Sequence, residues 1–143
     1  MSEPDPTDTE YYLNRELSEL ALQERVLHEG TDDRNPPLER LRFLAYFTKN
    51  TDEFFMKRVG GLKQQIDAGI TDRTPDGRTP KEQWREVLDT VRPLFGEQSD
   101  YWETTLKPTL ADAGIRIRDP EALSAEAREA LQTRFEESIL PTL

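Results

Sequence analysis

Residues 36–66 read PPLERLRFLAYFTKNTDEFFMKRVGGLKQQI and form the most apolar stretch of an otherwise polar chain of 143 residues. Apolar residues recur there at steps of three and four, which is the pattern of one helical face. Pro36 and Pro37 can open a helix because the first turn offers no partner for the missing amide. The stretch therefore predicts two consecutive helices. Their predicted inward positions are Leu41, Leu44, Ala45, Thr48, Phe55, Val59, Leu62 and Ile66.

A break between the two helices is predicted at residues 48–52, where polar residues interrupt the apolar pattern. Asn50 and Glu53 have the spacing of a capping box, with Asn in place of the usual Ser or Thr. We therefore expect Asn50 to cap the second helix. Asp52 and Glu53 are of a type suited to metal binding or acid–base chemistry, but their position favours capping, because acids stabilise the positive end of a helix.

The same stretch has a local excess of positive charge. Residues 38–63 contain six basic and three acidic residues, whereas the whole chain carries a net charge of −10. One interpretation is a basic flank that attracts a phosphorylated ligand. The other is an ordinary solvated face with helical ion pairs such as Glu53 with Lys57. The candidate phosphate-attracting residues are Arg40, Arg42, Lys57, Arg58 and Lys63.

The chain before this stretch predicts a disordered start and one further helix. Residues 1–10 are rich in Pro and Asp, a composition typical of disorder. Ser18 is predicted to cap a helix over residues 19–29, because its hydroxyl can accept a hydrogen bond from a first-turn amide. Gly30 fits the position just after the end of that helix.

The clearest helix start lies at Thr79–Glu82, where a capping box encloses a proline at the first helical position. An apolar seam continues from there past Pro93 and Pro108, so we expect one long kinked helix over about residues 80–113. Gly114 is predicted to end it. The seam positions are Trp84, Leu88, Val91, Phe95, Gln98, Trp102, Leu106 and Leu110.

Two further segments complete the pattern. Residues 67–79 are predicted to form an exposed, mobile loop, and Ser124 is predicted to cap a last helix. The chain stops in the apolar sequence ILPTL, so we expect the natural chain to continue past Leu143. The predicted inward positions of the last helix are Ala127, Leu131, Phe135 and Ile139.

Together these patterns predict an all-α fold, an elongated helical bundle with a hairpin-like N-terminal half. The residues are 34% hydrophobic and 34% charged, which suits long helices with thin apolar seams better than a thick globule. After the disordered start, residues 11–143 are predicted to form a single helical domain.

The composition excludes several classes of function. Without cysteine and with one histidine, His28, the chain can form neither a disulfide framework nor a two-imidazole metal site. Its acidity argues against free nucleic acid as a partner. No apolar run approaches the ~18 residues of a membrane span, and the acidic N-terminus lacks signal-peptide features, so we expect a cytoplasmic protein. No nucleophile–base pair can be assembled, so no catalytic residue is predicted.

Two motifs carry a resemblance to a known family. They are Asn14-Arg15-Glu16-Leu17-Ser18 and Asn50-Thr51-Asp52-Glu53-Phe54-Phe55. In this order and spacing they resemble the N-terminal domain of the large bacterial polyphosphate kinases, and the resemblance covers roughly residues 11–143. One departure is Glu19, at a position where the family usually has tryptophan.

The resemblance implies a helical domain of an enzyme that reversibly transfers the γ-phosphate of ATP to polyphosphate through a phosphohistidine. It implies that the histidine and the Mg²⁺ ligands lie in C-terminal domains, so this segment alone is expected to be inactive. It also implies contacts with those downstream domains and a homo-oligomeric parent. The single nucleotide-binding residue that it assigns to this segment is Asn50. The alternative function is a non-enzymatic helical interaction module that packs on a partner through residues 43–55.

Overall fold

The computed structural model describes residues 5–143, and these residues form helices, turns and loops without a β-strand. The all-α prediction is confirmed. The chain divides into two compact units, Met1–Thr109 and Leu110–Leu143, and each is considered by itself. The disorder predicted for residues 1–10 falls partly on residues 1–4, which lie outside the described residues. Within the remainder of that segment, Thr9–Tyr11 forms a 3₁₀ turn.

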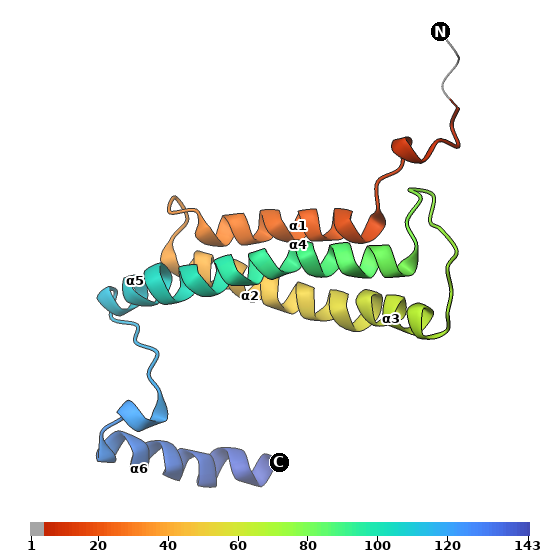
Figure 1. Ribbon diagram of the computed structural model, residues 1–143. Coiled ribbons are helices and arrows are strands. Elements are labelled where there is room, and N and C mark those ends of the chain that lie inside the picture. Colours follow the sequence, from red (N-terminus) through yellow and green to blue (C-terminus); the bar gives the residue numbers. More distant parts are fainter. Residues whose placement is uncertain (1–4) are drawn as a thin grey trace. The chain divides into compact units, whose positions relative to one another are not determined.

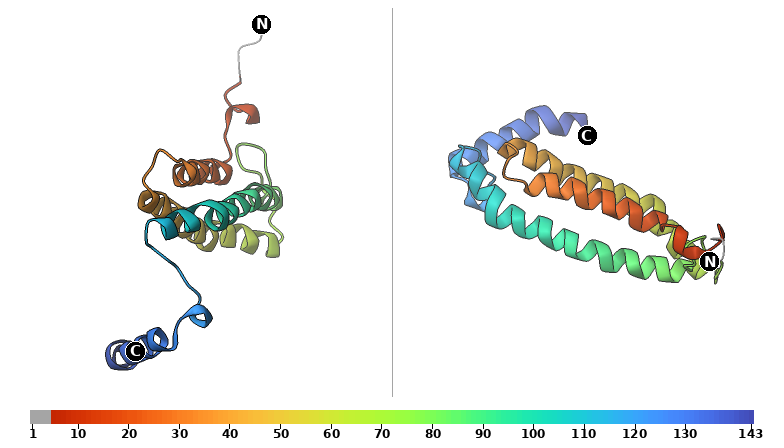
Figure 2. Two further views of the ribbon diagram at one scale, coloured as in Figure 1. Left: turned by 90° about the vertical axis from the view of Figure 1, so that its left-hand side faces the viewer. Right: turned by 90° about the horizontal axis from the view of Figure 1, so that it is seen from above.

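The first unit consists of three helical rods that lie side by side (Figures 1 and 2). The first rod is α1, Arg15–Thr31. The second rod runs in the opposite direction and comprises α2, Pro37–Phe54, a π-helical turn, Phe55–Val59, and α3, Gly60–Asp67. Helix α1 contacts α2 and α4, and α3 contacts α4, so the three rods enclose a common apolar seam.

The third rod is the predicted long helix. It comprises α4, Pro80–Tyr101, a π-helical turn, Trp102–Leu106, and α5, Lys107–Asp112. The capping box at its start is present, since Thr79 accepts from the Glu82 amide and the Glu82 carboxylate accepts from the Thr79 amide. Pro93 lies within α4 without ending it.

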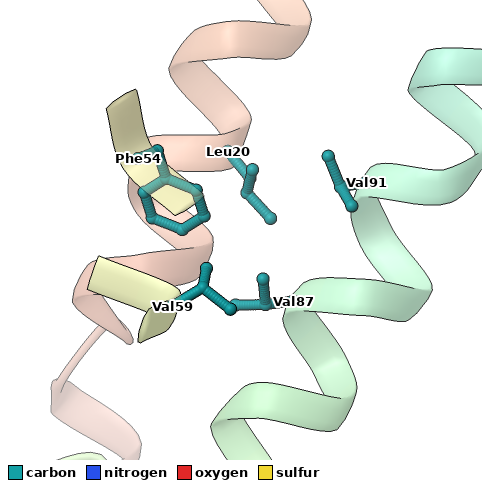
Figure 3. Packing of buried hydrophobic residues seen from close by; sticks show 5 residues of the cluster. All are labelled: Leu20, Phe54, Val59, Val87 and Val91. Atoms are coloured by element: carbon teal, nitrogen blue, oxygen red, sulfur yellow. The ribbon is translucent and has the colours of Figure 1, made fainter. Parts of the chain in front are cut away.

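The core of the first unit is narrow, and its central apolar side chains are buried. Figure 3 shows its central cluster, in which side chains from all three rods point toward one another. Farther along the rods, Phe47 is fully buried and packs edge-on against Phe95 with ring centroids 5.5 Å apart. A Cβ atom on Gly30 would lie 2.8 Å from a methyl of Leu44, so this glycine permits the close approach of α1 to α2. The cluster consists of Leu20, Phe54, Val59, Val87 and Val91.

The predicted start and end of the first helix are wrong. Helix α1 begins four residues earlier, because the side chain of Asn14 accepts hydrogen bonds from the amides of Glu16 (3.0 Å) and Leu17 (3.1 Å). Ser18 therefore lies inside the helix and does not cap it. Gly30 also lies inside, where its function is close packing rather than termination.

The predicted helix break at residues 48–52 is wrong as well. Helix α2 runs through this segment without interruption. Thr51 is buried, and its hydroxyl donates to the Phe47 carbonyl at 2.7 Å, so a polar side chain is accommodated within the helix. Asn50 therefore caps no helix, and Asp52 and Glu53 lie in a helix interior rather than at an N-terminus.

The predicted apolar faces of α2 and α4 are only partly correct, since some of the predicted positions are buried and others are exposed. In α2, Ala45 and Thr48 are exposed. In α4, Phe95 is 37% exposed, while Trp84 is only half-buried. The reason is that each buried face includes a polar residue, and a prediction from apolar periodicity leaves polar residues out. The buried positions of the two helices are Arg40, Leu44, Phe47, Thr51, Phe54, Pro80, Gln83, Val87, Val91 and Leu94.

The loop after α3 is tied to the start of α1. Asn14 donates from its side-chain nitrogen to Asp76 and to Gln83, each at 3.1 Å. Arg78 donates to Asp76 at 2.7 Å and to Glu86 at 2.9 Å. The loop is exposed at residues 70–73, as predicted, but the Asp76 side chain is buried.

The second unit contains a 3₁₀ turn, Pro120–Ala122, and α6, Ala125–Arg134, which continues through a π-helical turn, Phe135–Ile139. Ser124 caps α6 as predicted, since its hydroxyl accepts from the Ala127 amide. The inward face predicted for this helix is wrong. Leu131, Phe135 and Ile139 are exposed, because no other described element of this unit covers them.

Replacement of Phe47 by alanine should lower the free energy of unfolding by about 3–5 kcal/mol, because it removes a fully buried ring and leaves a cavity. Urea denaturation of the 143-residue chain measures this. The control is Met56→Ala, which truncates a side chain that is 75% exposed and should change stability by about 0.5 kcal/mol or less. Equal effects of the two changes would contradict the placement of Phe47 in the core.

The stability of the first unit should also depend on pH through Asp76. Burial raises the pKa of this carboxyl, but hydrogen bonds from Thr74, Arg78 and Asn14 outweigh it and leave the pKa below its usual 3.8. A depressed folded-state pKa adds stability that is complete above 3.8 and is lost as the pH falls below it. We expect Asp76→Asn to flatten the fall in stability below pH 4, measured by thermal unfolding at a series of pH values. An unchanged pH profile would exclude Asp76 as its source.

Candidate functional site

A cleft of about 400 Å³ opens between α1 and the second rod of the first unit. Its apolar surface comes from Leu22 and Phe54, and the rest of its lining is polar or charged. The lining includes Asn50, Lys57 and Arg58 from the sequence prediction. Its full set is Arg15, Glu16, Glu19, Leu22, Gln23, Asn50, Glu53, Phe54, Lys57 and Arg58.

The π-helical turn at Phe55–Val59 shapes the wall of the cleft that the second rod provides. The Gly60 amide donates to the Phe55 carbonyl, five residues back, so the turn holds one residue more than an α-helical turn. As a result Phe54 and Val59, which are five positions apart, both point into the core. The turn between these two anchors carries Lys57 and Arg58 to the cleft.

The charges around the cleft largely cancel. Arg58 binds Glu16 through two hydrogen bonds, of 2.6 Å and 3.1 Å, which join the π-helical turn to α1. Lys57 forms an ion pair with Glu53 one helical turn away. The lining contains three cationic and three carboxylate side chains in all. Such a wall has little net attraction for a polyphosphate chain and is better suited to an uncharged polar group.

Asn50 lies in this wall at the end of a chain of hydrogen bonds. Its side-chain nitrogen donates to the Gln23 carbonyl oxygen at 3.1 Å. The Gln23 nitrogen in turn donates to a Glu19 carboxylate oxygen at 2.8 Å. Gln23 is 3% exposed, and both bonds satisfy polar groups that burial has removed from water.

The other predicted cations do not line the cleft. Arg40 is buried and donates to the Tyr101 hydroxyl at 2.7 Å, while its Nε has no hydrogen-bond partner among the described residues. Arg42 pairs with Glu39 at 2.9 Å, and Lys63 pairs with Asp67 at 2.5 Å, both on exposed helix surface.

Arg15 and Gln23 are among the cleft residues that were not predicted as site residues. Arg15 stands at the first position of α1 and makes no ion pair with any other residue in the described part of the chain. Gln23 was missed because a buried amide leaves no periodic signal. The spacing of four between Glu19 and Gln23 allows a hydrogen bond on one helix face, but it does not indicate that Asn50 lies beside them.

Across residues 5–143, no group of three or more His, Cys, Asp or Glu side chains is arranged to hold a metal ion. No helix in that range is both long and apolar enough to cross a membrane.

The fold and the cleft define an all-α bundle domain with a charge-balanced polar cleft. Over residues 12–118 the chain matches the family described as polyphosphate kinase N-terminal domain, and it belongs to this family. The curated relatives that it matches carry the name polyphosphate kinase. One from Synechocystis sp. is 53% identical over 95% of this chain and 19% of its own length. Relatives from Erythrobacter litoralis and Halalkalibacterium halodurans are 48% and 44% identical over 96% and 99% of this chain.

The chain thus spans about a fifth of the length of these relatives, 19–20% in the three cases. No solved structure matches it.

Arg58→Ala should destabilise the first unit by roughly 1–3 kcal/mol, because it leaves the Glu16 carboxylate without its partner in a side chain that is 11% exposed. Lys57→Ala removes the neighbouring cation, whose ion pair is exposed, and should cost about 0.5 kcal/mol or less. Urea denaturation compares the two variants at equal net charge. A larger loss for Lys57→Ala would show that the cross-helix pair is not the stabilising one.

Proposed function

We propose that this chain is the N-terminal domain of an ATP-dependent polyphosphate kinase and that Asn50 forms part of its nucleotide pocket. In the proposed reaction, the γ-phosphate of ATP passes reversibly to polyphosphate through a phosphohistidine carried by another part of the polypeptide. The observation that carries the proposal is the position of Asn50 in the wall of the cleft. Membership of the family supports the reaction class.

The chemistry of the wall supports contact with the base rather than with the phosphates. A carboxamide offers a donor and an acceptor in one plane, which matches the edge of adenine. Leu22 and Phe54 provide apolar surface beside it, and the volume of about 400 Å³ lies in the range of small-molecule sites. Because Lys57 and Arg58 are already paired with carboxylates, the strong positive field that a triphosphate needs is expected from other domains.

Residues 5–143 do not fit the Mg²⁺ that the family implies, since they contain no cluster of metal-ligating side chains. No step is therefore assigned to a metal in this domain. Arg15 is the cation best placed to help at the cleft. A phosphate-attracting role for Arg40, Arg42 and Lys63 stays a prediction that draws no support from the cleft.

The proposal includes the partners of the whole enzyme. These are ATP or ADP, polyphosphate, the downstream domains of the same polypeptide and a second copy of it, in a cytoplasmic setting. The 143-residue chain by itself is expected to be inactive and to bind ATP weakly, because one wall of a composite pocket desolvates only part of a nucleotide.

The alternative, an interaction module that uses residues 43–55, is less well supported. Phe47 and Phe54 are buried inside the first unit, so they are not available to a partner. The large apolar side chain of this segment that is exposed is Tyr46, at 45% exposure.

In the full-length polypeptide that carries this segment, Asn50→Ala should raise the KM for ATP about 5- to 30-fold. This corresponds to one or two hydrogen bonds worth roughly 1–2 kcal/mol. Polyphosphate formation from ATP and Mg²⁺ measures the effect. Gln64→Ala, which deletes an exposed amide on α3 outside the cleft, is the matched control and should leave KM unchanged.

Three outcomes separate the alternatives. Polymer formation with a raised KM in Asn50→Ala alone supports both the reaction and the site. Polymer formation with an unchanged KM in both variants keeps the reaction and removes Asn50 from the pocket. Absence of polymer from a folded wild-type protein would overturn the proposed reaction and favour the interaction module.

A further inference from the structure

The amide of Asn50 is held in one orientation by the residues behind it. Three side chains form a directed series in which Asn50 donates to Gln23 and Gln23 donates to Glu19. The first two members are amides, and either of them could in principle be turned over, exchanging its donor and its acceptor. The direction of the series therefore depends on its last member.

Glu19 determines that direction. An ionised carboxylate carries no proton and only accepts hydrogen bonds, so Gln23 must present its NH₂ group to Glu19. The Gln23 oxygen then faces Asn50 and requires a donor, which is the Asn50 NH₂ group. Reversal of either amide would place two acceptors or two donors together at a side chain that is 3% exposed, where an unsatisfied group costs roughly 1–3 kcal/mol.

The consequence at the cleft is a fixed pattern. One proton of the Asn50 NH₂ group is used by Gln23, so the remaining proton and the carbonyl oxygen are left for a ligand. A purine base that is bound in one orientation presents its position 6 and its N1 to the Asn50 amide. A 6-aminopurine offers a donor at position 6 and an acceptor at N1, whereas a 6-oxopurine offers the reverse. An amide that can turn over binds both of these donor–acceptor patterns. An amide of fixed orientation binds only one of the two patterns.

We propose that Glu19 and Gln23 are positioning residues that make Asn50 select 6-aminopurine nucleotides over 6-oxopurine nucleotides. This inference rests on the proposed function, because it requires the base to contact Asn50. It concerns the orientation of that amide, which the contact alone does not determine. It also gives a role to Glu19, the residue at which this chain departs from the tryptophan of the motif.

The test uses the full-length polypeptide with ATP and ITP, which differ only in the groups at position 6 and N1 of the base. Glu19→Gln keeps the size and a hydrogen bond to Gln23, but an amide can donate as well as accept, so the series can reverse. In the reversed series Asn50 accepts from Gln23 and presents two protons to the cleft. The control is Glu24→Gln, the same change at an exposed residue of α1 outside the cleft.

We expect the ratio of kcat/KM for ATP to that for ITP to fall about 3- to 10-fold in Glu19→Gln, through KM, with kcat at saturating ATP unchanged. Glu24→Gln should keep the wild-type ratio. Glu19→Ala, which removes the directing acceptor altogether, should shift the ratio in the same direction and serves as the second variant if Glu19→Gln folds poorly.

The outcomes distinguish this inference from the function on which it rests. If Asn50→Ala raises the KM for ATP while both Glu19 variants keep the wild-type ratio, the orienting series is overturned and the nucleotide contact stands. If kcat falls in the Glu19 variants with an unchanged ratio, Glu19 acts on the fold rather than on selectivity, which also overturns it. If the folded wild type forms no polymer from ATP, the proposed function fails and the inference fails with it.

Discussion

The architecture of the first unit depends on one irregularity, the π-helical turn at Phe55–Val59. The second rod must keep its apolar side against α1 and α4 over more than two dozen residues, and the extra residue in this turn places both Phe54 and Val59 in the core. It also brings Arg58 to Glu16 on α1. The same turn therefore contributes both to core packing, through Val59, and to a cross-helix ion pair, through Arg58.

The polar composition of the chain is compatible with this three-rod bundle because each rod buries only a narrow face. Much of what is buried is polar but paired. Asn14 connects the loop at Asp76 to Gln83. Gln23 is satisfied on both sides, and Thr51 donates to the backbone of its own helix. The hydrogen bonds of Asn14 and Gln23 thus join separate helices as well as satisfying buried polar groups.

Some local signals in the sequence predicted helix boundaries correctly, whereas those at Ser18, Gly30 and Asn50 did not. The capping box at Thr79 and the single cap at Ser124 were predictable because the donor and the acceptor of each hydrogen bond lie within one turn. Asn50 was misassigned as a cap because an asparagine can serve as a cap, a helix-interior residue or a cross-helix donor, and only the neighbouring helix decides which. The resemblance to a known family singled out Asn50 independently of its backbone role, so the proposal for this residue does not depend on the predicted helix break.

The buried faces were predicted only in part, for a related reason. Arg40 and Gln83 occupy core positions where a regular apolar pattern would have Leu or Val. The prediction therefore followed the adjacent row of apolar residues instead. The same limit applies to the cleft, where two of the residues that matter most are a glutamine and a glutamate on one helix. Their role depends on Asn50, a third residue on another helix. The carboxylate can set the direction of the hydrogen bonds only because it and the two amides form one continuous series. In the proposed site, the interior of the bundle therefore gives the Asn50 amide a defined orientation.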